Sequence, residues 1–234
     1  MKSDEPQIYP LPPVLSIIVP MLNEIEQLPE LMAHLLQWQR RGHEVLLIDG
    51  GSSDNSASVA KALGFKVFHS HCGRAIQMNA GAARAKGSAL VFLHADTRMP
   101  LDADLQIIEA LKKRSWGRFD IQLSGDRWML RVIAFLMNLR SRISGIATGD
   151  QAIFIDRTTF FATGGFPEQP LLEDIEISKR LKRRGRPQCL QSRVTSSGRR
   201  WIAFGVWPTI CLMWRIRWAY WRGTSADQLA KEYQ

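Results

Sequence analysis

Carboxylates and one imidazole directly follow apolar runs that have the length of buried strands. The run from Ala89 to Leu93 is followed at once by His94 and Asp96. A carboxylate at the end of a buried strand loses solvation unless it is bonded, so a ligand or a cation would explain its position. Asp96 with a neighbouring ligand suits Mg²⁺ or Mn²⁺ carrying a diphosphate. A single aspartate at a strand end is more often a cap, which is the alternative here.

Two earlier apolar runs end in the same way. The run from Leu15 to Pro20 is followed by Asn23 and Glu24, and a second run ends at Asp49. The glycines of the segment "DGGSSDNS" that starts at Asp49 would let the backbone approach a ligand. A tight turn with a helix cap explains the same residues. The segment is not a phosphate-binding loop, since no Gly-Lys-Ser/Thr follows.

A candidate helix cap and a pair of acids stand at the starts of two predicted helices. We predict a helix over "SDNSASVAKALG", with Ser53 or Asp54 as its cap. Glu173 and Asp174 stand directly before the amphipathic helix "IEISKRLKRRG". Acids at this position interact favourably with the helix dipole. Alternatively, one of them is a general base that takes a proton from an attacking hydroxyl.

These groups are positioned by an alternation of strand and helix patterns from Leu15 to Asp96. Apolar runs of strand length alternate with amphipathic segments that end in glycine. Such an alternation predicts a doubly wound, mostly parallel α/β sheet. Ligands of such sheets bind at the carboxyl ends of the strands, where the polar residues lie.

The rest of the chain is less regular but contains further elements. We predict strands over "WGRFDIQLSG" and "QAIFIDR", and helices over "DRWMLRVIAFLMNLRSRISG" and "LLEDIEISKRLKRRG". The pattern indicates one domain over residues 15–234 after a loose, proline-rich leader over 1–14. Its expected parts are a nucleotide-binding half (15–100), an acceptor and catalytic half (101–200), and a tryptophan-rich helical segment (201–234).

The composition restricts the partners and the compartment. The net charge is +9, which favours phosphates, nucleic acid or an anionic membrane. No nucleic-acid recognition motif is present, and the aromatic residues are mostly tryptophans of an apolar helical stretch, so we expect no nucleic acid. The three cysteines are isolated, which indicates a reducing, cytoplasmic environment.

The C-terminal segment "WIAFGVWPTICLMW" is uncharged but interrupted by Pro208. It is too short to span a bilayer. Its tryptophans beside arginines suit an interfacial helix, while a core or dimer helix explains them equally well. An interfacial helix would place the protein on the cytoplasmic face of the inner membrane.

Four segments in order carry a family resemblance. The segments "LSIIVPMLNE", "LLIDGGSSDNS", "GSALVFLHADT" and "TGGFPEQPLLEDIEISKRLKRRG" resemble glycosyltransferase family 2, whose fold is called GT-A. The segments "RAIQMNAGAARAKG", "TGDQAIF" and "TSSGRRW" are similar to a bacterial subgroup of this family. Its members are the arsenosugar-biosynthesis, or selenodomain-associated, glycosyltransferases.

The resemblance implies a nucleotide-sugar donor, usually a uridine diphosphate sugar. It implies a nucleotide pocket on the residues after the first two strands, which are Pro20, Asn23, Glu24, Asp49, Gly50 and Asp54. Arg199 and Arg200 fall where related enzymes place basic groups over the leaving diphosphate. Arg74 could contact the same phosphates, although an exposed surface position is the simpler interpretation.

The resemblance also implies a metal and a base. Asp96 matches the last acid of the Asp-x-Asp motif that binds Mn²⁺ or Mg²⁺, and His94 replaces the first acid. Asp174 matches the catalytic base, with Glu173 as the alternative. The implied reaction is an inverting transfer to a hydroxyl of a small-molecule or lipid-linked acceptor.

Two other classes of protein remain as alternatives. A sugar-phosphate nucleotidyltransferase has a similar architecture but needs a glycine-rich loop with a basic residue where this chain has "MLNE". A non-catalytic protein that binds anions or a membrane surface would explain the charge. It would leave the acids at the three strand ends without a role.

Overall fold

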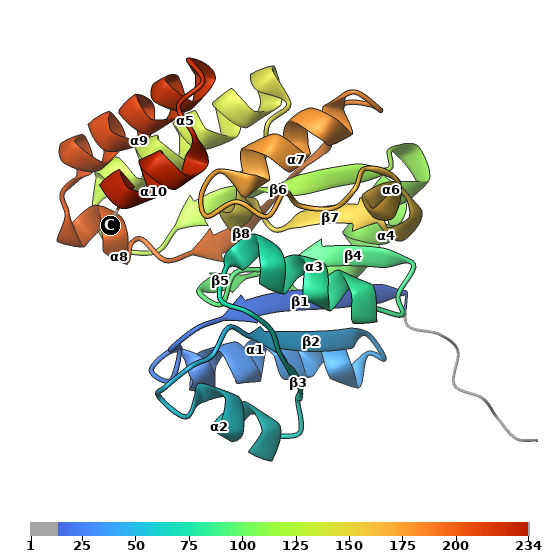
Figure 1. Ribbon diagram of the computed structural model, residues 1–234. Helices are drawn as coiled ribbons and strands as arrows, with labels where there is room; N and C mark the ends of the chain where they lie inside the picture. Colours follow the sequence, from blue (N-terminus) through green and yellow to red (C-terminus); the bar gives the residue numbers. More distant parts are fainter. Residues whose placement is uncertain (1–13, 234) are drawn as a thin grey trace, which may run out of the picture.

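The computed structural model describes residues 14–233, apart from the side chain of Arg200. The predicted leader therefore lies outside the described residues except for Val14. One eight-stranded sheet forms the centre of the molecule, in the order β3-β2-β1-β4-β7-β6-β8-β5 (Figure 1). The strands are β1 (Leu15–Met21), β2 (Glu44–Asp49), β3 (Lys66–His69), β4 (Ala89–Phe92), β5 (Thr97–Arg98), β6 (Trp116–Leu123), β7 (Ile153–Asp156) and β8 (Gln188–Ser196).

Helices cover both faces of this sheet and extend beyond one end. The α-helices are α1 (Leu28–Arg40), α2 (Ser56–Ala62), α3 (Arg74–Arg84), α4 (Ala103–Lys113), α5 (Trp128–Ser144), α6 (Arg157–Ala162), α7 (Glu173–Lys182), α8 (Arg199–Ala203), α9 (Val206–Trp221) and α10 (Ala226–Tyr233). A single 3-10 turn, η1 (Gly149–Gln151), precedes β7. The predicted alternation of strands and helices up to Asp96 is confirmed.

The sheet is parallel where the sequence predicts it and mixed further along. β1 pairs in parallel with both β2 and β4, and β2 pairs in parallel with β3. The carboxyl ends of β1, β2 and β4 therefore lie at one edge. β7 runs antiparallel to β4 and to β6, while β6 and β8 are parallel. Because β4 pairs with β7, the two predicted halves share one continuous sheet.

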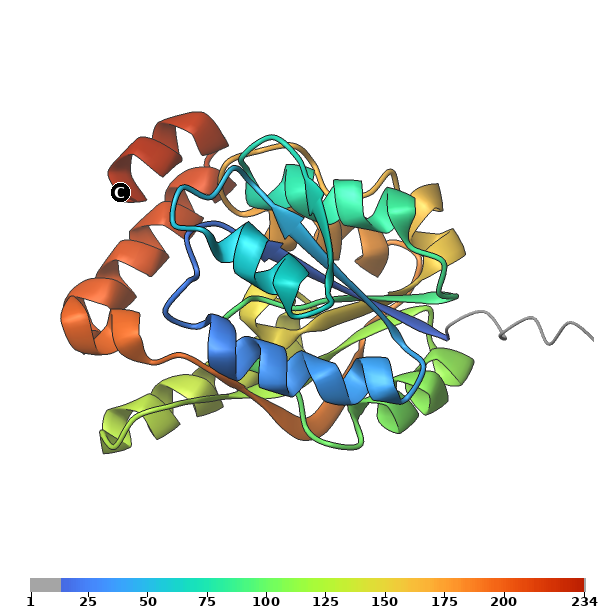
Figure 2. The same ribbon diagram turned by 90° about the horizontal axis from the view of Figure 1, so that it is seen from below.

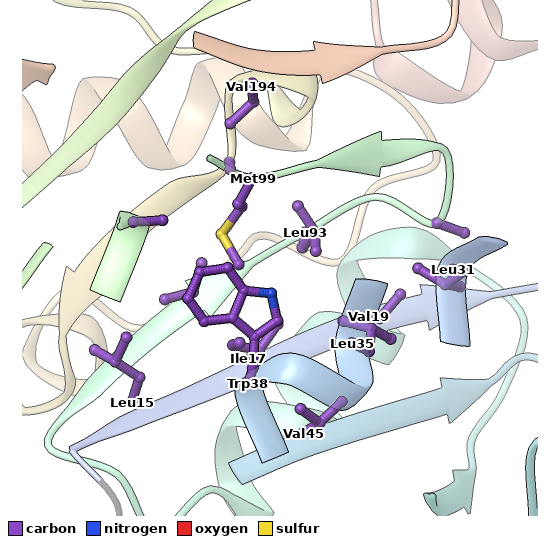
Figure 3. Close-up of a cluster of buried hydrophobic side chains, with 14 of the residues drawn as sticks. Leu15, Ile17, Val19, Leu31, Leu35, Trp38, Val45, Leu93, Met99 and Val194 are labelled. Atoms are coloured by element: carbon purple, nitrogen blue, oxygen red, sulfur yellow. The ribbon is translucent and has the colours of Figure 1, made fainter. Parts of the chain in front are cut away.

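Two hydrophobic clusters fill the space between the sheet and its helices. One combines β1 with α1 and α4, and the other combines β4 with α3, α6 and α7. Figure 2 shows α1 and α3 on opposite sides of the sheet. Trp38 of α1 is fully buried, and Figure 3 places it beside Met99 and Ile17. This packing fixes the strands whose ends carry the polar residues.

The last helices form a separate group at one end of the molecule. Figures 1 and 2 both show α5, α8, α9 and α10 gathered there. A small cluster of Leu172, Ile216 and Leu229 joins the start of α7 to α9 and α10. Across residues 14–233, no helix has both the length and the apolar character needed to cross a membrane.

Candidate active site

The loops that follow β1 and β2 are bonded to each other and form one surface. The Asn23 side chain accepts the N–H of Ser53 (2.8 Å), while the Asn23 N–H donates to Ser52 Oγ (2.9 Å). The Glu24 N–H donates to Ser56 Oγ (2.9 Å). Asn23 has a φ of 54°, a left-handed conformation that asparagine tolerates better than most residues. Two of the predicted strand-end segments are thus brought together.

Asp54 strengthens the same junction. Its carboxylate accepts the N–H of Ile25 (2.9 Å) and the N–H of Ser56 (3.0 Å). The hydrogen bond from the Ser56 hydroxyl is the main cause that lowers the pKa of Asp54. The helix begins at Ser56, with Asn55 at its N-cap and no side-chain capping bond. The prediction of a cap at Ser53 or Asp54 is therefore wrong, because Asp54 bonds across to the β1 loop as well as to the helix.

Asp49 is buried at the end of β2 and accepts several hydrogen bonds. Its carboxylate accepts the N–H of Gly51 (3.1 Å) and of Ser52 (3.2 Å), and it lies 3.1 Å from Nδ1 of His69. Burial raises the pKa of Asp49, but the bonds from Ser52, Gly51 and His69 outweigh burial and lower it. Asp49 is therefore an ionised acceptor that shapes the loop. Its contact with a nucleotide base stays a prediction.

Gly50 and Pro20 are buried. A Cβ on Gly50 would approach the Gln77 side chain to 3.1 Å. Gln77 in turn donates to the carbonyls of Met21 (2.9 Å) and Ile48 (2.7 Å), which ties α3 to both strand ends. Pro20 is buried within β1, in register with Ile48. Both residues support the loops from beneath, and their place in a nucleotide pocket stays a prediction.

Charges from four segments meet above these loops. Burial raises the pKa of Glu24, and the nearby charge of Asp96 raises it further. The guanidinium groups of Arg199 and Arg74 act in the opposite direction, while Asp54 adds to the increase. Asp96, Asp54, Arg199 and Arg74 therefore all lie near enough to Glu24 for their charges to act on it.

His94 lies beneath this place, against η1. Burial lowers the pKa of His94 well below its ordinary value, and the charge of Arg74 acts in the same direction. The imidazole is therefore neutral, the form that binds metals. Its Nε2 is buried and has no hydrogen-bond partner among the described residues. Gly149 lies directly against this nitrogen, since a Cβ on Gly149 would collide with the imidazole ring.

Asp96 is the predicted metal ligand that is most open to a bound group. It is partly exposed, and among the described residues it accepts one long hydrogen bond, from Thr97 Oγ1 (3.3 Å). Nowhere in residues 14–233 do three His, Cys, Asp or Glu side chains come together closely enough to hold a metal ion. A cation that also takes diphosphate oxygens and water needs fewer protein ligands, and Asp96 fits such a site. His94 stays a predicted ligand.

The two acids at the start of α7 have different surroundings. Glu173 is only 4% exposed, and its carboxylate lies 3.7 Å from the Arg74 guanidinium. Burial raises the pKa of Glu173, the adjacent Asp174 raises it further, and Arg74 opposes both, which leaves the pKa at about 7. Arg74 is exposed, as the simpler interpretation predicts, and its guanidinium also pairs with Glu173.

Asp174 is held from both sides by backbone donors. It accepts the Gly149 N–H (3.0 Å) from η1 and the Ile175 N–H (2.7 Å) from its own helix. Leu172 before the helix has a φ of 64°, so the chain turns sharply into α7. Asp174 therefore interacts with its helix start, as the simpler interpretation expects, and is also fixed on η1 beside His94.

Arg199 and Arg200 are the first two residues of α8. Arg199 is exposed, and its Nε donates to Ser197 Oγ (3.0 Å) at the end of β8. Its charge reaches Glu24, as the pKa of that residue indicates. The backbone of Arg200 belongs to α8, but its side chain lies outside the described part of the structure.

Three charged residues near Asp174 were missed by the sequence analysis. Asp150 of η1 is partly exposed, but its Oδ1 is buried, and desolvation raises its pKa. The charges of Arg140 on α5 and Arg217 on α9 both act to lower the pKa of Asp150. The segment "TGDQAIF" contains Asp150, but its residue pattern gave no indication of a charged cluster. The arginines come from helices whose packing the sequence does not specify.

The site thus combines three parts. These are a loop surface rich in hydrogen-bond acceptors, an open carboxylate at Asp96, and two acids at the start of α7. Arginines stand beside both groups of acids. Such a set can bind a nucleoside diphosphate, hold a cation on it, and take a proton from an attacking group. A GT-A fold with polar strand ends of this kind defines the class of nucleotide-sugar-dependent glycosyltransferases.

Comparison with known proteins gives the family. The sequence model of Glycosyl transferase family 2 matches residues 16–166, which is more than half of the chain. The chain therefore belongs to glycosyl transferase family 2, and the predicted family is confirmed. The narrower subgroup stays a resemblance.

Curated relatives match part of the chain. An undecaprenyl-phosphate 4-deoxy-4-formamido-L-arabinose transferase from Sodalis glossinidius (strain morsitans) is 30% identical over 153 residues, covering 58% of this chain and 46% of the relative. The enzyme of the same name from Shewanella sediminis (strain HAW-EB3) is 34% identical over 95 residues, covering 39% and 29%. The chain thus spans less than half the length of these relatives.

Solved structures share the fold. S. aureus TarS (residues 1–349) in complex with UDP-GlcNAc has a TM-score of 0.64 and 16% identity, covering 78% of this chain and 58% of that one. The Pyrobaculum calidifontis mannosyltransferase PcManGT in complex with GDP-Man and Mn²⁺ has a TM-score of 0.63 and 19% identity, covering 79% and 57%. At these identities the likeness shows the GT-A fold alone, and it confirms the predicted fold class.

Proposed function

We propose that this protein is an inverting glycosyltransferase that moves a sugar from a nucleoside diphosphate sugar to a hydroxyl of its acceptor. The observation that carries the proposal is the meeting of Glu24, Asp96 and Arg74 at the carboxyl edge of the sheet. The pair Glu173 and Asp174 lies beside it, joined to it by Arg74. Membership of the family supports this function over a nucleotidyltransferase or a non-catalytic protein.

The donor lies, in this proposal, on the loops after β1 and β2. The ionised Asp49 and the bonded Asn23 shape a pocket for the nucleotide, most simply uridine diphosphate. Asp96 would hold a divalent cation, which neutralises charge on the leaving diphosphate. Arg199 and Arg74 stand where guanidinium groups can stabilise the same charge as it grows. The Mn²⁺ bound with GDP-Man in the P. calidifontis enzyme supports a cation.

Asp174 is the proposed general base. The acceptor hydroxyl gives its proton to the Asp174 carboxylate while its oxygen forms a bond to the anomeric carbon. The bond from that carbon to the diphosphate breaks on the opposite side, so the configuration inverts. The Gly149 N–H fixes the Asp174 carboxylate through Oδ2. Glu173 is buried against Arg74 and is the proposed positioning residue.

The acceptor is proposed to lie at a membrane surface. The curated relatives are named for transfer involving undecaprenyl phosphate, which supports a lipid-linked acceptor over a freely soluble one. A peripheral position on an anionic membrane face, on the cytoplasmic side, follows from that choice and from the net charge of +9.

Two exposed apolar stripes support this position. On α9 the tryptophans Trp207, Trp214, Trp218 and Trp221 are 59–78% exposed. Their spacing of seven, four and three residues places them on one side of the helix. The opposite side, with Ile216, packs into the protein. One side of α9 is therefore core, as one interpretation of the tryptophan segment predicts. The exposed tryptophans of the other side support the interfacial interpretation, which stays a proposal.

The second stripe lies on α5, at the same end of the molecule (Figure 1). Its exposed members are Trp128, Val132, Phe135, Leu136, Leu139 and Ile143. We call the two stripes together the tryptophan face. Arg131 beside it is exposed, and Arg222 lies over the Trp218 ring at 5.0 Å. Tryptophans with arginines at their edges suit the boundary between lipid head groups and acyl chains.

A screen of nucleotide sugars by thermal denaturation tests the function. Uridine and guanosine diphosphate sugars are added with and without Mn²⁺, and nucleoside diphosphate release is measured in parallel. A donor at about 100 times its Kd stabilises the native state by about 2.7 kcal/mol. For a chain of this size the melting temperature would rise by about 5–10 °C. A protein that no nucleotide sugar stabilises would not have this function.

A further inference from the structure

Two arginines near the start of α7 have buried nitrogens without partners. Among the described residues, Nε and Nη2 of Arg140 and Nε of Arg217 are buried and make no hydrogen bond. Buried donors without an acceptor are rare in folded proteins, because they lose their hydration and gain nothing in return. These nitrogens therefore call for an acceptor that comes from outside the chain.

The charge of Asp174 acts on Arg140, and the turn η1 connects the two helices that carry these residues. The Gln151 side chain donates to Asn138 on α5 (3.4 Å), and the Gly149 N–H donates to Asp174 (3.0 Å). The turn η1 thus bridges α5 and α7. Arg140 lies two residues after Asn138, on the same helix.

Contacts through α9 place Arg217 at the same location. Its neighbour Ile216 is 1% exposed and packs with Leu172, directly before α7. Tyr220, one turn later, lies near Glu176 of α7, with Oη 3.5 Å from the Glu176 carboxylate. Arg217 therefore belongs to the part of α9 that covers the start of α7.

Arg140 and Arg217 share this location with Asp150 and Asp174, but their buried nitrogens are not bonded to these acids. Burial and the charge of Arg217 lower the pKa of Arg140 to about 10, while Asp150 and Asp174 oppose this. Desolvation raises the pKa of Asp150, and its buried Oδ1 has no hydrogen-bond partner within the described residues. Among these residues the buried nitrogens of two like charges have no bonded counterion, which is unfavourable unless an anion binds.

We propose that Arg140 and Arg217 bind a phosphate ester group of the acceptor and thereby hold an acceptor hydroxyl next to Asp174. The guanidinium fork matches phosphate oxygens in geometry and charge, which a hydroxyl alone would not. Asp150 would orient the two guanidinium groups. This inference depends on the proposed function, because it assigns the acceptor side of the same site.

The test uses a matched pair of probes that differ only in the anion. Glycerol phosphate and glycerol are titrated into the intact protein loaded with uridine diphosphate and Mn²⁺, and inorganic phosphate is titrated as a third probe. Glycerol phosphate should bind, and glycerol should not. Arg140→Gln and Arg217→Gln should each weaken glycerol phosphate binding about tenfold or more. Arg217→Lys should weaken it less, since the charge remains.

The control is Arg215→Gln on the same helix. Arg215 is exposed and pairs with Glu232 (3.1 Å), so its loss should leave glycerol phosphate binding unchanged. Thermal denaturation of every variant checks that the fold is retained. Equal binding of glycerol and glycerol phosphate would overturn the proposal. Wild-type affinity for glycerol phosphate in both folded Arg140→Gln and folded Arg217→Gln would overturn it as well. If Arg217→Gln does not fold, Arg217→Lys takes its place in this comparison.

Failure of the proposed function gives a different result. If the wild type binds no nucleotide at all, the function is wrong, and the anion titration is then read on the free protein. If nucleotide binds normally to wild type and variants but glycerol phosphate does not bind, only the anion site is wrong. If glycerol phosphate does bind, turnover with soluble glycerol phosphate is compared with turnover on phosphatidylglycerol vesicles. This comparison separates a free phosphate ester from a lipid head group as the source of the bound phosphate.

Discussion

Gly149 donates its backbone N–H to the Asp174 carboxylate over 3.0 Å, while its Cα lies against the buried ring of His94. One residue without a side chain thus separates the proposed base from the imidazole of the proposed metal site. Any displacement of Gly149 changes both at once. The short turn η1 is therefore the element through which the donor side and the acceptor side of the site are kept in register.

Gly149→Ala should damage this arrangement. The new Cβ would collide with Nε2 and Cε1 of His94, and this Nε2 is buried. We expect a loss of about 1–3 kcal/mol in the free energy of unfolding, with a fall in turnover and a weaker Mn²⁺-dependent donor affinity, because Asp174 and His94 would both be displaced. Chemical denaturation and nucleotide titration measure these quantities.

A matched glycine provides the control for that change. A Cβ on Gly185 would meet no atom within 4 Å, so Gly185→Ala should be nearly neutral. The double variant Gly149→Ala/His94→Ala should recover part of the lost stability, because the collision is removed. Additive losses in this cycle would show that the contact with His94 is not the cause.

Asp174→Asn should separate catalysis from binding. The amide keeps the size of the side chain and loses the basicity, so turnover should fall by a factor of about 10²–10⁴. Donor affinity should stay near that of the wild type, since Asp174 bonds to Gly149 and to its own helix and not to the nucleotide loops. Transfer rate and donor titration are measured side by side.

Glu173→Gln distinguishes the two acids. If Glu173 is a positioning residue, Glu173→Gln should lower turnover less than Asp174→Asn does. The reverse order would make Glu173 the base, a role that its pKa of about 7 would suit at neutral pH. A collapse of donor binding in Asp174→Asn would instead give Asp174 a place in the metal or nucleotide site.

Asp96→Asn should remove the dependence of nucleotide binding on the metal. The expected result is a uridine diphosphate affinity that Mn²⁺ no longer increases. The melting temperature of the free protein should not change, because Asp96 makes one long hydrogen bond within the described part of the chain. Calorimetric titration with and without Mn²⁺ measures this. An Mn²⁺ effect equal to that of the wild type would place the cation elsewhere.

His94→Asp examines the second predicted ligand. A carboxylate would recreate the pair of acids typical of the family and should shift the preference from Mn²⁺ toward Mg²⁺, since Mg²⁺ prefers oxygen ligands. The ratio of activities with the two metals is the measurement. If that ratio does not change, His94 only packs against Gly149.

The strand ends could be predicted from sequence because each follows an apolar run whose direction the fold fixes. Asn23, Asp49 and Asp96 lie at one edge since β1, β2 and β4 are parallel, which the alternation of elements implies. The antiparallel position of β7 could not be predicted, because a short apolar strand has the same pattern in either direction. No pattern in the sequence singled out β8, although it is the longest strand.

The acceptor side escaped prediction for a related reason. Arg140 and Arg217 come from helices separated by most of the second half of the chain, and only tertiary packing brings them to Asp174. The cap of α2 was misplaced because Asp54 uses its carboxylate for Ile25 of another loop as well as for Ser56. Local propensity cannot indicate a partner that is distant in sequence.

The pKa of Glu173 predicts how stability changes with pH. Its value rises from an ordinary 4.5 to about 7 on folding, so the native state binds more protons than the unfolded state between these values. This stabilising contribution is complete below about pH 4.5 and is lost as pH rises through about 7. Glu173→Gln should remove the dependence and unfold at a higher temperature than the wild type above pH 8. Identical pH profiles of the two melting temperatures would contradict a raised pKa.

The tryptophan face should bind anionic membranes. Trp214 and Trp218 are 73% and 59% exposed, and burying half of a tryptophan side chain in the interface is worth about 2 kcal/mol. The double variant Trp214→Gln/Trp218→Gln should therefore bind phosphatidylglycerol vesicles more than about tenfold less well. Leu105→Gln on α4 is the control, since Leu105 is 67% exposed on a helix far from α9 in both Figure 1 and Figure 2. Vesicle flotation at low and high salt measures the effect, and added salt should weaken wild-type binding because the arginines contribute. A double variant that floats with the vesicles as completely as the wild type would remove the membrane from the proposal.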